Sequence, residues 1–360
     1  HARKLEESET TEPSKKRWYL PHHAVCNPNK PDKIRVVFDA AAKFNGTSLN
    51  DNLLTGPDLL QDLPGLLIRF RERPVAITGD IDQMFHQVQI LPSDRPALSF
   101  LWRSMERNRP PDTYEMKKAI FGAKCSPAIA SFALRTVIKS CCDQSITADE
   151  AADISRQFYM DDFVTSEDSV DAAKKLLHTV VDLVAKGGFK LRKWTTNSRE
   201  VLDSVAPEDR AHPATDLSKS LPSGRVLGMV WDAEQDELGV HRPEKNDIPA
   251  TKRRVLAAIA SIYDPLGLIA PFTLQAKLIM QDLWKQQLSW DSELTERDMQ
   301  RWVAWKIQAD QLSQLRIPRC YAATDAKIVR RELHIFSDAS EAAFGAAGYL
   351  RQIDSAGAIS

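Results

Sequence analysis

The sequence lacks the features that mark secreted and membrane-inserted proteins. Its five cysteines show neither the density of a disulfide framework nor the paired spacing of a zinc site, which favours a reduced environment. No signal peptide is visible at the start, and no uninterrupted apolar run reaches the length of a membrane span. The net charge of −1 neither favours nor excludes a polyanionic partner. We therefore expect a soluble, intracellular chain with no membrane partner.

The composition is that of a globular protein. The 360 residues are 43% hydrophobic and 27% charged, which is enough for a sizeable core and for two or more domains. Residues 1–14 are polar, and we expect a disordered lead-in there. The chain begins with His1 rather than Met, so we expect it to be a piece of a longer protein.

Strand-like and helix-like patterns follow one another along the chain without an internal repeat. Residues 250–315 favour helices, and residues 332–351 favour a final pair of strands. The sequence therefore predicts an α+β architecture with a mixed core, a helical domain and the start of another sheet. The elements expected earlier in the chain are strands at 33–40 and 75–90, helix-like spacing at 50–71 interrupted by Pro57 and Pro64, paired strands at 99–103 and 113–121, a helix at 126–142 capped by Ser126, and a helix at 169–188.

The stretch QFYMDDFVTS, residues 157–166, places two adjacent aspartates between apolar residues, where we expect a strand, a tight turn and a strand. A desolvated carboxylate is costly unless it is neutralised, so Asp161 and Asp162 need a physical reason. One interpretation is a polar turn, since Asp favours turns. The other is a metal site, because Asp80 closely follows the apolar VAIT stretch and two such strands can meet in one sheet. An oxygen-only site suits Mg²⁺, and two such ions suit phosphoryl transfer.

Five stretches in order resemble motifs A to E of a reverse transcriptase: TGDIDQMF, FGAKCSPAIA, FYMDDFV, GGFKLRKW and VLGMVW. The surrounding text narrows the resemblance to the polyprotein of BEL/Pao-type LTR retrotransposons, over roughly residues 17–350. The stretches that carry it are YLPHHAV, KIRVVFDAAAKFNGTSLNDNLLTGPDLL, ASIYDPLGLIAPFTLQAKLIMQDLW and HIFSDASEAAFGAAGYLR.

The resemblance implies a right-hand polymerase with fingers, palm and thumb, a helical connection, and the first strands of a ribonuclease H-like domain. We expect a lead-in at 1–14, fingers and palm at 15–245, a helical thumb or connection at 246–318, and a truncated ribonuclease H-like start at 331–360. The implied activity is that of an RNA-directed DNA polymerase, which transfers a nucleotide from a dNTP to a primer 3′-OH on an RNA or DNA template.

The implied metal site uses Asp80, the backbone carbonyl of Ile81, and Asp161. Two Mg²⁺ ions are expected, with Mn²⁺ as a substitute. Asp162 completes the implied catalytic set through its local electrostatic field, whereas Asp82 is expected to be a solvated neighbour.

The implied dNTP site uses four further residues. Arg35 clamps the triphosphate, Phe85 acts as an aromatic gate that crowds a ribose 2′-OH, and Gly122 permits close backbone approach. The fourth is a lysine that donates a proton to the leaving pyrophosphate. We assign this role to Lys193, although Lys190 fits equally well and a solvated lysine is a third interpretation.

Two observations qualify this dNTP site. Phe121 stands where many retroviral relatives have Gln, so an amide contact is absent. Phe85 can also be interpreted as a plain core aromatic.

The resemblance places Tyr159 beside the primer end, and Leu227 with Gly228 in a primer-grip hairpin, for which a plain structural turn is the alternative. Asp338 resembles the first carboxylate of a ribonuclease H site. Because few residues follow it, we expect no ribonuclease H activity from this fragment.

The implied partners are an RNA template, a DNA primer and template, dNTPs and other segments of the polyprotein. The implied location is a cytoplasmic virus-like particle, and the implied processes are transposition and DNA integration. Two alternatives stay open. One is a catalytically silent or domesticated nucleic-acid-binding fragment. The other is an aspartic-peptidase segment, which is disfavoured because no Asp-Ser-Gly or Asp-Thr-Gly triplet is present.

Overall fold

The computed structural model describes residues 1–11, 16–27, 30–104, 106–142, 146–212, 221, 223–240, 251–321, 328–357 and 359. Within this part, the side chains of Lys30 and Lys33 are outside the description. None of the helices in it is long and apolar enough to cross a membrane. All five cysteines carry free thiols.

The chain forms two compact units. Unit 1 comprises residues 1–61, 80–163 and 176–192, and unit 2 comprises residues 62–79, 164–175 and 193–360. Four elements begin in one unit and end in the other: β4 (Val75–Ile81), β8 (Asp162–Glu167), α6 (Val170–Ala185) and β9 (Leu191–Thr196). Three of them belong to a four-stranded sheet with the strand order β7-β8-β4-β9.

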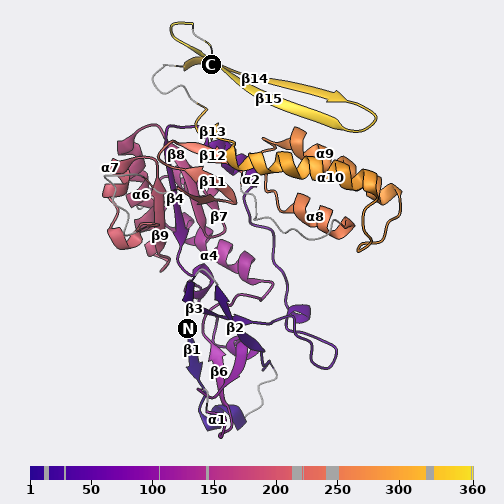
Figure 1. Cartoon of the computed structure of the whole chain (residues 1–360). Coiled ribbons are helices and arrows are strands. Elements are labelled where there is room, and N and C mark those ends of the chain that lie inside the picture. Colours follow the sequence, from indigo (N-terminus) through magenta and orange to yellow (C-terminus); the bar gives the residue numbers. More distant parts are fainter. Residues whose placement is uncertain are drawn as a thin grey trace. The chain divides into compact units, whose positions relative to one another are not determined.

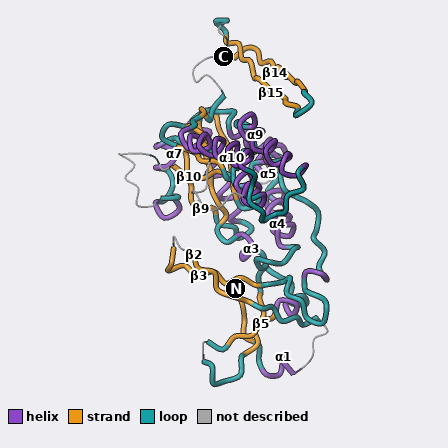
Figure 2. Tube along the Cα trace, turned by 45° about the vertical axis from the view of Figure 1, so that its right-hand side comes forward, coloured by secondary structure: helices purple, strands orange, loops and turns teal. Residues whose placement is uncertain are grey.

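Unit 1 contains two further small sheets, β1-β6-β5 and β2-β3. Figure 2 shows β2 and β3 as an extended hairpin. Its elements are β1 (Ala2–Lys4), α1 (Glu7–Thr11), β2 (His22–Asn27), β3 (Lys30–Phe38), η1 (Asn50–Asn52), α3 (Met84–Gln87), η2 (Arg95–Leu98), β5 (Ser99–Trp102), β6 (Asp112–Met116), α4 (Ser126–Ser140), α5 (Ala148–Arg156) and β7 (Phe158–Tyr159). A buried cluster that includes Phe38, Leu98, Met116 and Ile120 joins β3, η2 and β6 to the loop before α4.

Unit 2 contains an antiparallel sheet, β10-β11-β12-β13, a group of three helices and a long hairpin. Its elements are α2 (Leu63–Phe70), α7 (Arg199–Asp203), η3 (Pro207–Asp209), β10 (Ser223–Val226), β11 (Met229–Asp232), β12 (Glu237–Gly239), α8 (Lys252–Ala260), α9 (Ala270–Lys285), α10 (Glu296–Ala309), η4 (Asp310–Gln314), β13 (Ile317–Pro318), β14 (Ile328–Ala339) and β15 (Phe344–Asp354). The antiparallel pairing of β14 with β15 confirms the final pair of strands, which Figure 1 shows as a long ribbon.

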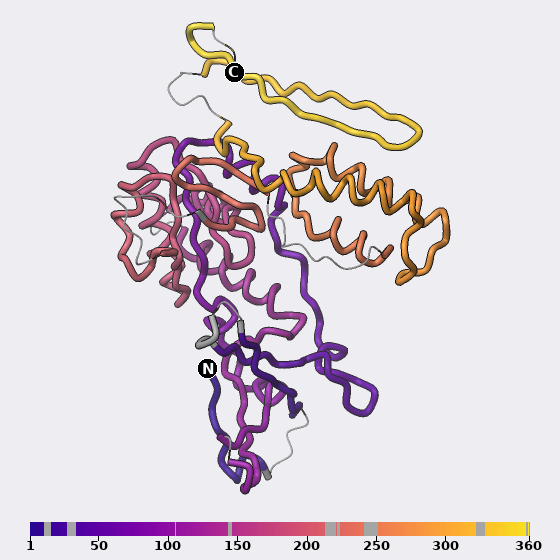
Figure 3. Tube along the Cα trace, viewed as in Figure 1, coloured from indigo at the N-terminus to yellow at the C-terminus, as the bar shows by residue number. Residues whose placement is uncertain are grey.

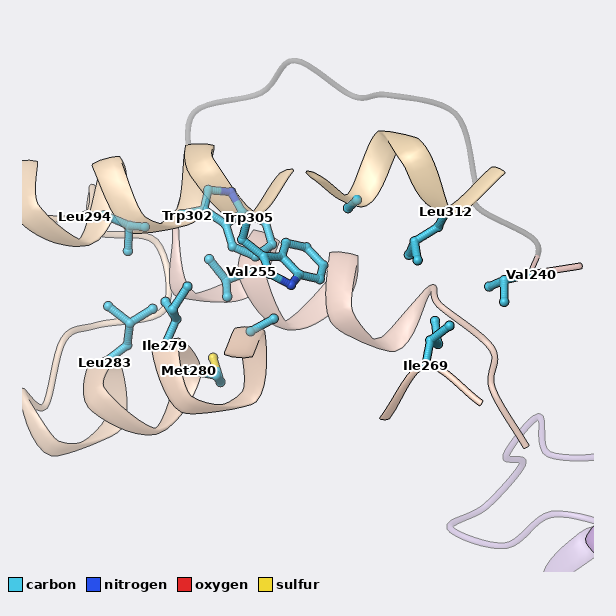
Figure 4. Close-up of a cluster of buried hydrophobic side chains, with 12 residues drawn as sticks. Val240, Val255, Ile269, Ile279, Met280, Leu283, Leu294, Trp302, Trp305 and Leu312 are labelled. Carbon is cyan, nitrogen blue, oxygen red and sulfur yellow. The ribbon is translucent and has the colours of Figure 1, made fainter. Parts of the chain in front are cut away.

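The helices α8, α9 and α10 share an apolar core, as the helix-favouring composition predicts. Trp302 and Trp305 of α10 are buried and stacked, with ring centroids 5.0 Å apart, and Figure 4 shows them facing Val255 and Ile279. The indole N–H of Trp305 donates to the carbonyl of Phe272 at 3.2 Å, so its polar atom is satisfied inside the core. These two tryptophans are therefore structural.

The lead-in differs from the expected disorder in its described part. β1 pairs with β6, with Ala2 opposite Met116, and the side chain of Leu5 is buried. The Arg3 guanidinium lies 2.8 Å from the buried carboxylate of Glu115, which needs a charged partner. This ion pair between Arg3 and Glu115 contributes to the ordering of the polar N-terminal segment.

Two expected elements are shorter than their patterns suggest. The helix-like spacing at 50–71 produces only η1 and α2, and Figure 3 follows residues 53–61 as a stretch without helix or strand. Pro57 lies within that stretch, whereas Pro64 does not interrupt a helix but stands in the first turn of α2, which begins where Asp62 accepts the Gly65 N–H at 2.8 Å. The strand expected at 75–90 ends at Ile81, because Gln83 adopts a positive φ of 49° that starts the short helix α3.

The helix at 126–142 is present as α4, but Ser126 does not cap it. Cys125 occupies the N-cap position, and the Ser126 hydroxyl donates instead to the carbonyl of Ile120 at 2.7 Å. The helix expected at 169–188 is α6, which ends at Ala185 before the two glycines.

Arg319 is fully buried and holds several chain segments of unit 2 together. Its guanidinium pairs with both carboxylate oxygens of Asp236, at 2.7 and 2.8 Å. It also donates to three backbone carbonyls between α2 and β4, those of Phe70, Arg73 and Pro74. Planar bidentate pairing of this kind is the strongest ion-pair geometry available to arginine. One side chain thus joins the segment after β13 to the turn before β12 and to the chain that leads into β4.

We predict that Arg319→Met lowers the free energy of unfolding by about 3–5 kcal/mol, because it leaves a carboxylate and three carbonyls without their donor. Arg316→Met is the matched control. Arg316 is exposed and donates to the nearby carbonyls of Ser313 and Leu315, so a change within about 0.5 kcal/mol is expected. Urea unfolding measures both. Equal midpoints for the two variants would contradict the structural role of Arg319.

Candidate functional site

The two aspartates lie in a tight hairpin turn. Phe158 pairs with Phe163 and Tyr159 pairs with Asp162, which leaves Met160 and Asp161 as the two turn residues. The rings of Phe158 and Phe163 are buried, with centroids 5.0 Å apart, and they anchor the turn. This is the strand, tight turn and strand expected from the sequence, and it keeps the aspartates half-buried rather than fully buried.

Met160 has a positive φ of 54°, which is uncommon for a residue other than glycine. Such a conformation stores strain and persists only where the surroundings determine it. The Met160 side chain contributes to a small pocket with Ser131 and Leu134 of α4, and its sulfur lies 3.9 Å from the Ser131 hydroxyl. Packing against α4 therefore supports the strained turn.

The end of β4 lies directly beside this turn. The N–H of Ile81 donates to the carbonyl of Asp161 at 2.8 Å, and the N–H of Asp82 donates to the carbonyl of Lys190 at 2.8 Å. These bonds place the backbone of Asp80 and Ile81 next to the Asp161 turn on one side and next to the start of β9 on the other. The structure thus brings together the Asp80 and Asp161 segments, which are far apart in the sequence.

The donor set of this region is made of oxygen. Within the described residues, no group of three or more His, Cys, Asp or Glu side chains is arranged to hold a metal ion. Mg²⁺ commonly binds through one or two carboxylates together with substrate phosphates, rather than in a cage made only of protein. Carboxylates such as those of Asp80 and Asp161 are of the donor type that such an ion uses.

Gly122 lies in a tightly bonded loop in front of α4. Its φ is +103°, and a Cβ at this position would overlap the backbone carbonyl oxygen of Phe38. The Asn50 side-chain amide donates to the Gly122 carbonyl at 3.0 Å, while its oxygen accepts the Lys124 N–H at 2.9 Å. Sequence reasoning missed Asn50. Its only signal is an amide that can both donate and accept, within a stretch of turn residues.

Phe85 and Phe121 form a ring pair. Phe85 is half-buried on α3, Phe121 is 47% exposed, and their centroids lie 4.6 Å apart at 53°. The rings of His86 and Phe121 are perpendicular, with centroids 5.6 Å apart. Burial lowers the pKa of His86, and the nearby positive charge of Lys118 adds to this effect.

The other expected site residues within unit 1 have accessible side chains. Arg35 is exposed on β3, where it pairs with Val25 across the hairpin. Tyr159 is half-buried in β7, and Lys190 is exposed just before β9.

Four of the expected site residues lie within unit 2. Lys193 is exposed on β9 with a φ of 56°. Leu227 and Gly228 form the turn between β10 and β11, and a Cβ on Gly228 would lie 2.6 Å from the Tyr263 ring. Asp338 is exposed on β14, opposite Gly345.

Comparison with known families adds two matches. Residues 53–197 match the family described as reverse transcriptase (RNA-dependent DNA polymerase), and residues 251–360 match the Pao retrotransposon-like RNaseH-like domain. Taken together, the two matches confirm the resemblance stated from the motifs. No curated protein matches the chain.

A similar solved structure is that of the foamy viral protease-reverse transcriptase dRH in complex with double-stranded DNA. It has a TM-score of 0.56 and 14% sequence identity, and the match covers 94% of this chain. At this identity the likeness concerns the fold alone, and it confirms the α+β class. The chain spans 50% of the length of that solved chain.

The matches also bear on the expected boundaries and activities. The RNaseH-like family covers residues 251–360, whereas only 331–360 were expected to be related to ribonuclease H. The expectation that the fragment lacks ribonuclease H activity therefore has no support from the comparisons. The reverse transcriptase match includes Asp80, Phe85, Gly122, Tyr159–Asp162 and Lys193, but not Arg35 or Leu227–Gly228.

We predict that Gly122→Ala lowers the free energy of unfolding by about 3 kcal/mol or more, because it adds a steric overlap with Phe38 to a strained φ. Gly46→Ala is the matched control. Gly46 also has a positive φ, of +84°, but nothing lies within 4 Å of its Cβ position, so about 1 kcal/mol is expected. Urea unfolding of both variants gives the difference. If Gly46→Ala costs as much as Gly122→Ala, the close approach to Phe38 is not what requires glycine.

Proposed function

We propose that the chain is the RNA-directed DNA polymerase region of a Pao-type retrotransposon. It would transfer a nucleotide from a dNTP to a primer 3′-OH on an RNA or DNA template. The observation that carries this proposal is the hydrogen bond from the Ile81 N–H to the Asp161 carbonyl, which sets motif A beside motif C. The family match over 53–197 and the likeness to a foamy viral fold support it.

In this proposal the residues of unit 1 have distinct tasks. Asp80, Asp161 and the Ile81 carbonyl would hold two Mg²⁺ ions, with Mn²⁺ as a substitute, and Asp162 would strengthen the local negative field. The bound ions supply activation of the attacking hydroxyl and stabilisation of charge on the phosphate. Tyr159 would support the primer end beside the turn.

Further residues would position the incoming dNTP. The exposed guanidinium of Arg35 is suited to bidentate contact with a triphosphate. Phe85 would exclude a ribose 2′-OH, and the backbone at Gly122 would allow close approach of the base pair. Lys193 or Lys190 would donate a proton to the pyrophosphate, and Leu227 with Gly228 would contact the primer.

At the level of domains we propose fingers and palm within residues 15–245 and a thumb or connection within 246–318. Residues 331–360 would begin the ribonuclease H-like part. The exposed Trp284 and Trp290 pack against Lys252, whose ammonium lies 3.4 Å from the Trp284 centroid, and this leaves aromatic surface available beside basic residues. The partners would be RNA, DNA, dNTPs and other polyprotein segments. The location would be a cytoplasmic virus-like particle engaged in transposition and DNA integration.

We predict that Asp161→Asn reduces primer extension with Mg²⁺ by about 1,000-fold or more, equivalent to about 4 kcal/mol, because a metal-binding carboxylate is lost. Asp80→Asn should do the same, and Asp162→Asn should reduce the rate less. Asp82→Asn, two residues after Asp80, is the matched control and should retain activity. Incorporation of labelled dNTP on a primed RNA template measures all four.

This assay also separates the polymerase from a silent nucleic-acid-binding fragment. A parent chain that binds primer and template but incorporates nothing with Mg²⁺ or Mn²⁺ would favour the second function. Equal loss in Asp82→Asn and Asp161→Asn would show that the assigned metal residues are wrong.

A separate prediction concerns Asp338, the one carboxylate in the C-terminal hairpin to which the resemblance gives a role. Although residues 251–360 match an RNaseH-like domain, we keep the proposal that the fragment leaves an RNA–DNA hybrid intact. Degradation of a labelled hybrid by the parent, lost in Asp338→Asn but kept in Asp354→Asn, would establish the opposite.

A further inference from the structure

The ring pair of Phe85 and Phe121 has a geometry that suits joint action. The 4.6 Å separation and 53° tilt fall within the range of favourable aromatic contacts. Phe85 comes from α3, a helix of only four residues that follows the positive-φ N-cap residue Gln83. So short an element gives Phe85 little support of its own. The contact with Phe121 is therefore well placed to select the rotamer of Phe85.

Phe121 is itself held on both sides by its backbone. The preceding Ile120 is fully buried, and its carbonyl accepts the Ser126 hydroxyl at 2.7 Å. The following Gly122 is bonded to Asn50 at 3.0 Å and lies against the Phe38 carbonyl. The ring of Phe121 nevertheless stays 47% exposed. A large apolar ring that is partly exposed, on a loop held by these contacts, is suited to contact a ligand as well as Phe85.

We propose that Phe121 is a specificity-determining residue that acts with Phe85, so that two rings, rather than one, reject a ribonucleotide. This inference rests on the proposed polymerase function and deepens it. Phe85 would face the sugar, and Phe121 would prevent Phe85 from turning away. Two apolar rings also offer no hydrogen-bond partner to a 2′-OH, and a hydroxyl that loses water without a partner is disfavoured.

A purely apolar wall rejects an added hydroxyl by only about 100-fold, so stronger discrimination requires a ring that cannot move. If Phe121 is removed, Phe85 can adopt other rotamers and the steric part of the discrimination is lost. The acceptance of dNTPs does not depend on this restraint. The effect should therefore be on the ratio of rNTP to dNTP use, which a general loss of folding would leave unchanged.

The test is a comparison of kcat/KM for a dNTP and for the matching rNTP on one primer and template. We expect Phe121→Ala and Phe121→Leu to reduce discrimination by about tenfold or more, chiefly by raising kcat/KM for the rNTP. Phe121→Tyr retains the ring that restrains Phe85 but adds a hydroxyl, so it should lose less discrimination than Phe121→Ala or Phe121→Leu. Phe132→Ala, which removes a 65% exposed phenylalanine of α4, is the matched control and should leave both values unchanged.

A double-mutant cycle shows whether Phe121 acts through Phe85. Phe85→Ala should reduce discrimination more than either Phe121 variant, and adding Phe121→Ala to it should cause no further change. Additive effects would mean that Phe121 contacts the sugar independently, and the proposed restraint would be wrong. If Phe121→Ala fails to fold, the Leu and Tyr variants decide the question.

The outcomes keep the two proposals apart. A parent chain that incorporates no dNTP sinks the polymerase function and this inference with it. A parent that incorporates dNTPs and rejects rNTPs, with discrimination unchanged in Phe121→Leu, refutes the inference alone.

Discussion

The pairing of β4 at Ile81 and Asp82 is the constraint on which the candidate site depends. Two backbone bonds of 2.8 Å, to Asp161 on one side and to Lys190 on the other, make the end of β4 a central strand end with partners on both sides. Each bond involves backbone atoms alone, so side chains remain available for chemistry. The backbone pairing and the buried Phe158–Phe163 ring contact therefore hold the segments that carry Asp80 and Asp161 side by side.

A second constraint connects the two matched family segments. Arg319, within the RNaseH-like match, donates to the carbonyls of Phe70, Arg73 and Pro74, within the reverse transcriptase match. A fully buried arginine is tolerated only where nearly every N–H finds an acceptor, and Asp236 supplies the matching charge. Because Pro74 directly precedes β4, the strand that carries Asp80 begins at a point fixed by a residue far downstream. The two matched segments, 53–197 and 251–360, are therefore joined by the hydrogen bonds of Arg319.

The features that the sequence could predict are those with local causes. The turn at Met160–Asp161 follows from two aspartates between aromatic residues, and the pairing of β14 with β15 follows from apolar patterns on either side of a polar stretch. The site residue Asn50 could not be predicted, because its partner Gly122 is 72 positions away and nothing in an asparagine marks a distant bond. Arg319 reaches Phe70 across 249 positions in the same way. The strand expected at 75–90 was too long because a positive φ at Gln83 overrides the alternation of residues that follow it.

The geometry of the turn also gives a reason for unequal roles within the aspartate pair. Asp162 belongs to β8 and pairs with Tyr159, so its backbone serves the hairpin. Asp161 is a turn residue whose carbonyl accepts the Ile81 N–H, so its backbone connects the turn to the end of β4. Successive side chains of a strand point to opposite faces of the sheet. The side chains of Asp161, in the turn, and Asp162, in β8, therefore point in different directions unless the strand is distorted. Met160, with its positive φ, supplies the reversal that sets Asp161 in the turn. On this argument, strain at Met160 and the metal role proposed for Asp161 are two consequences of one hairpin, and changing the turn conformation should impair Asp161 before Asp162.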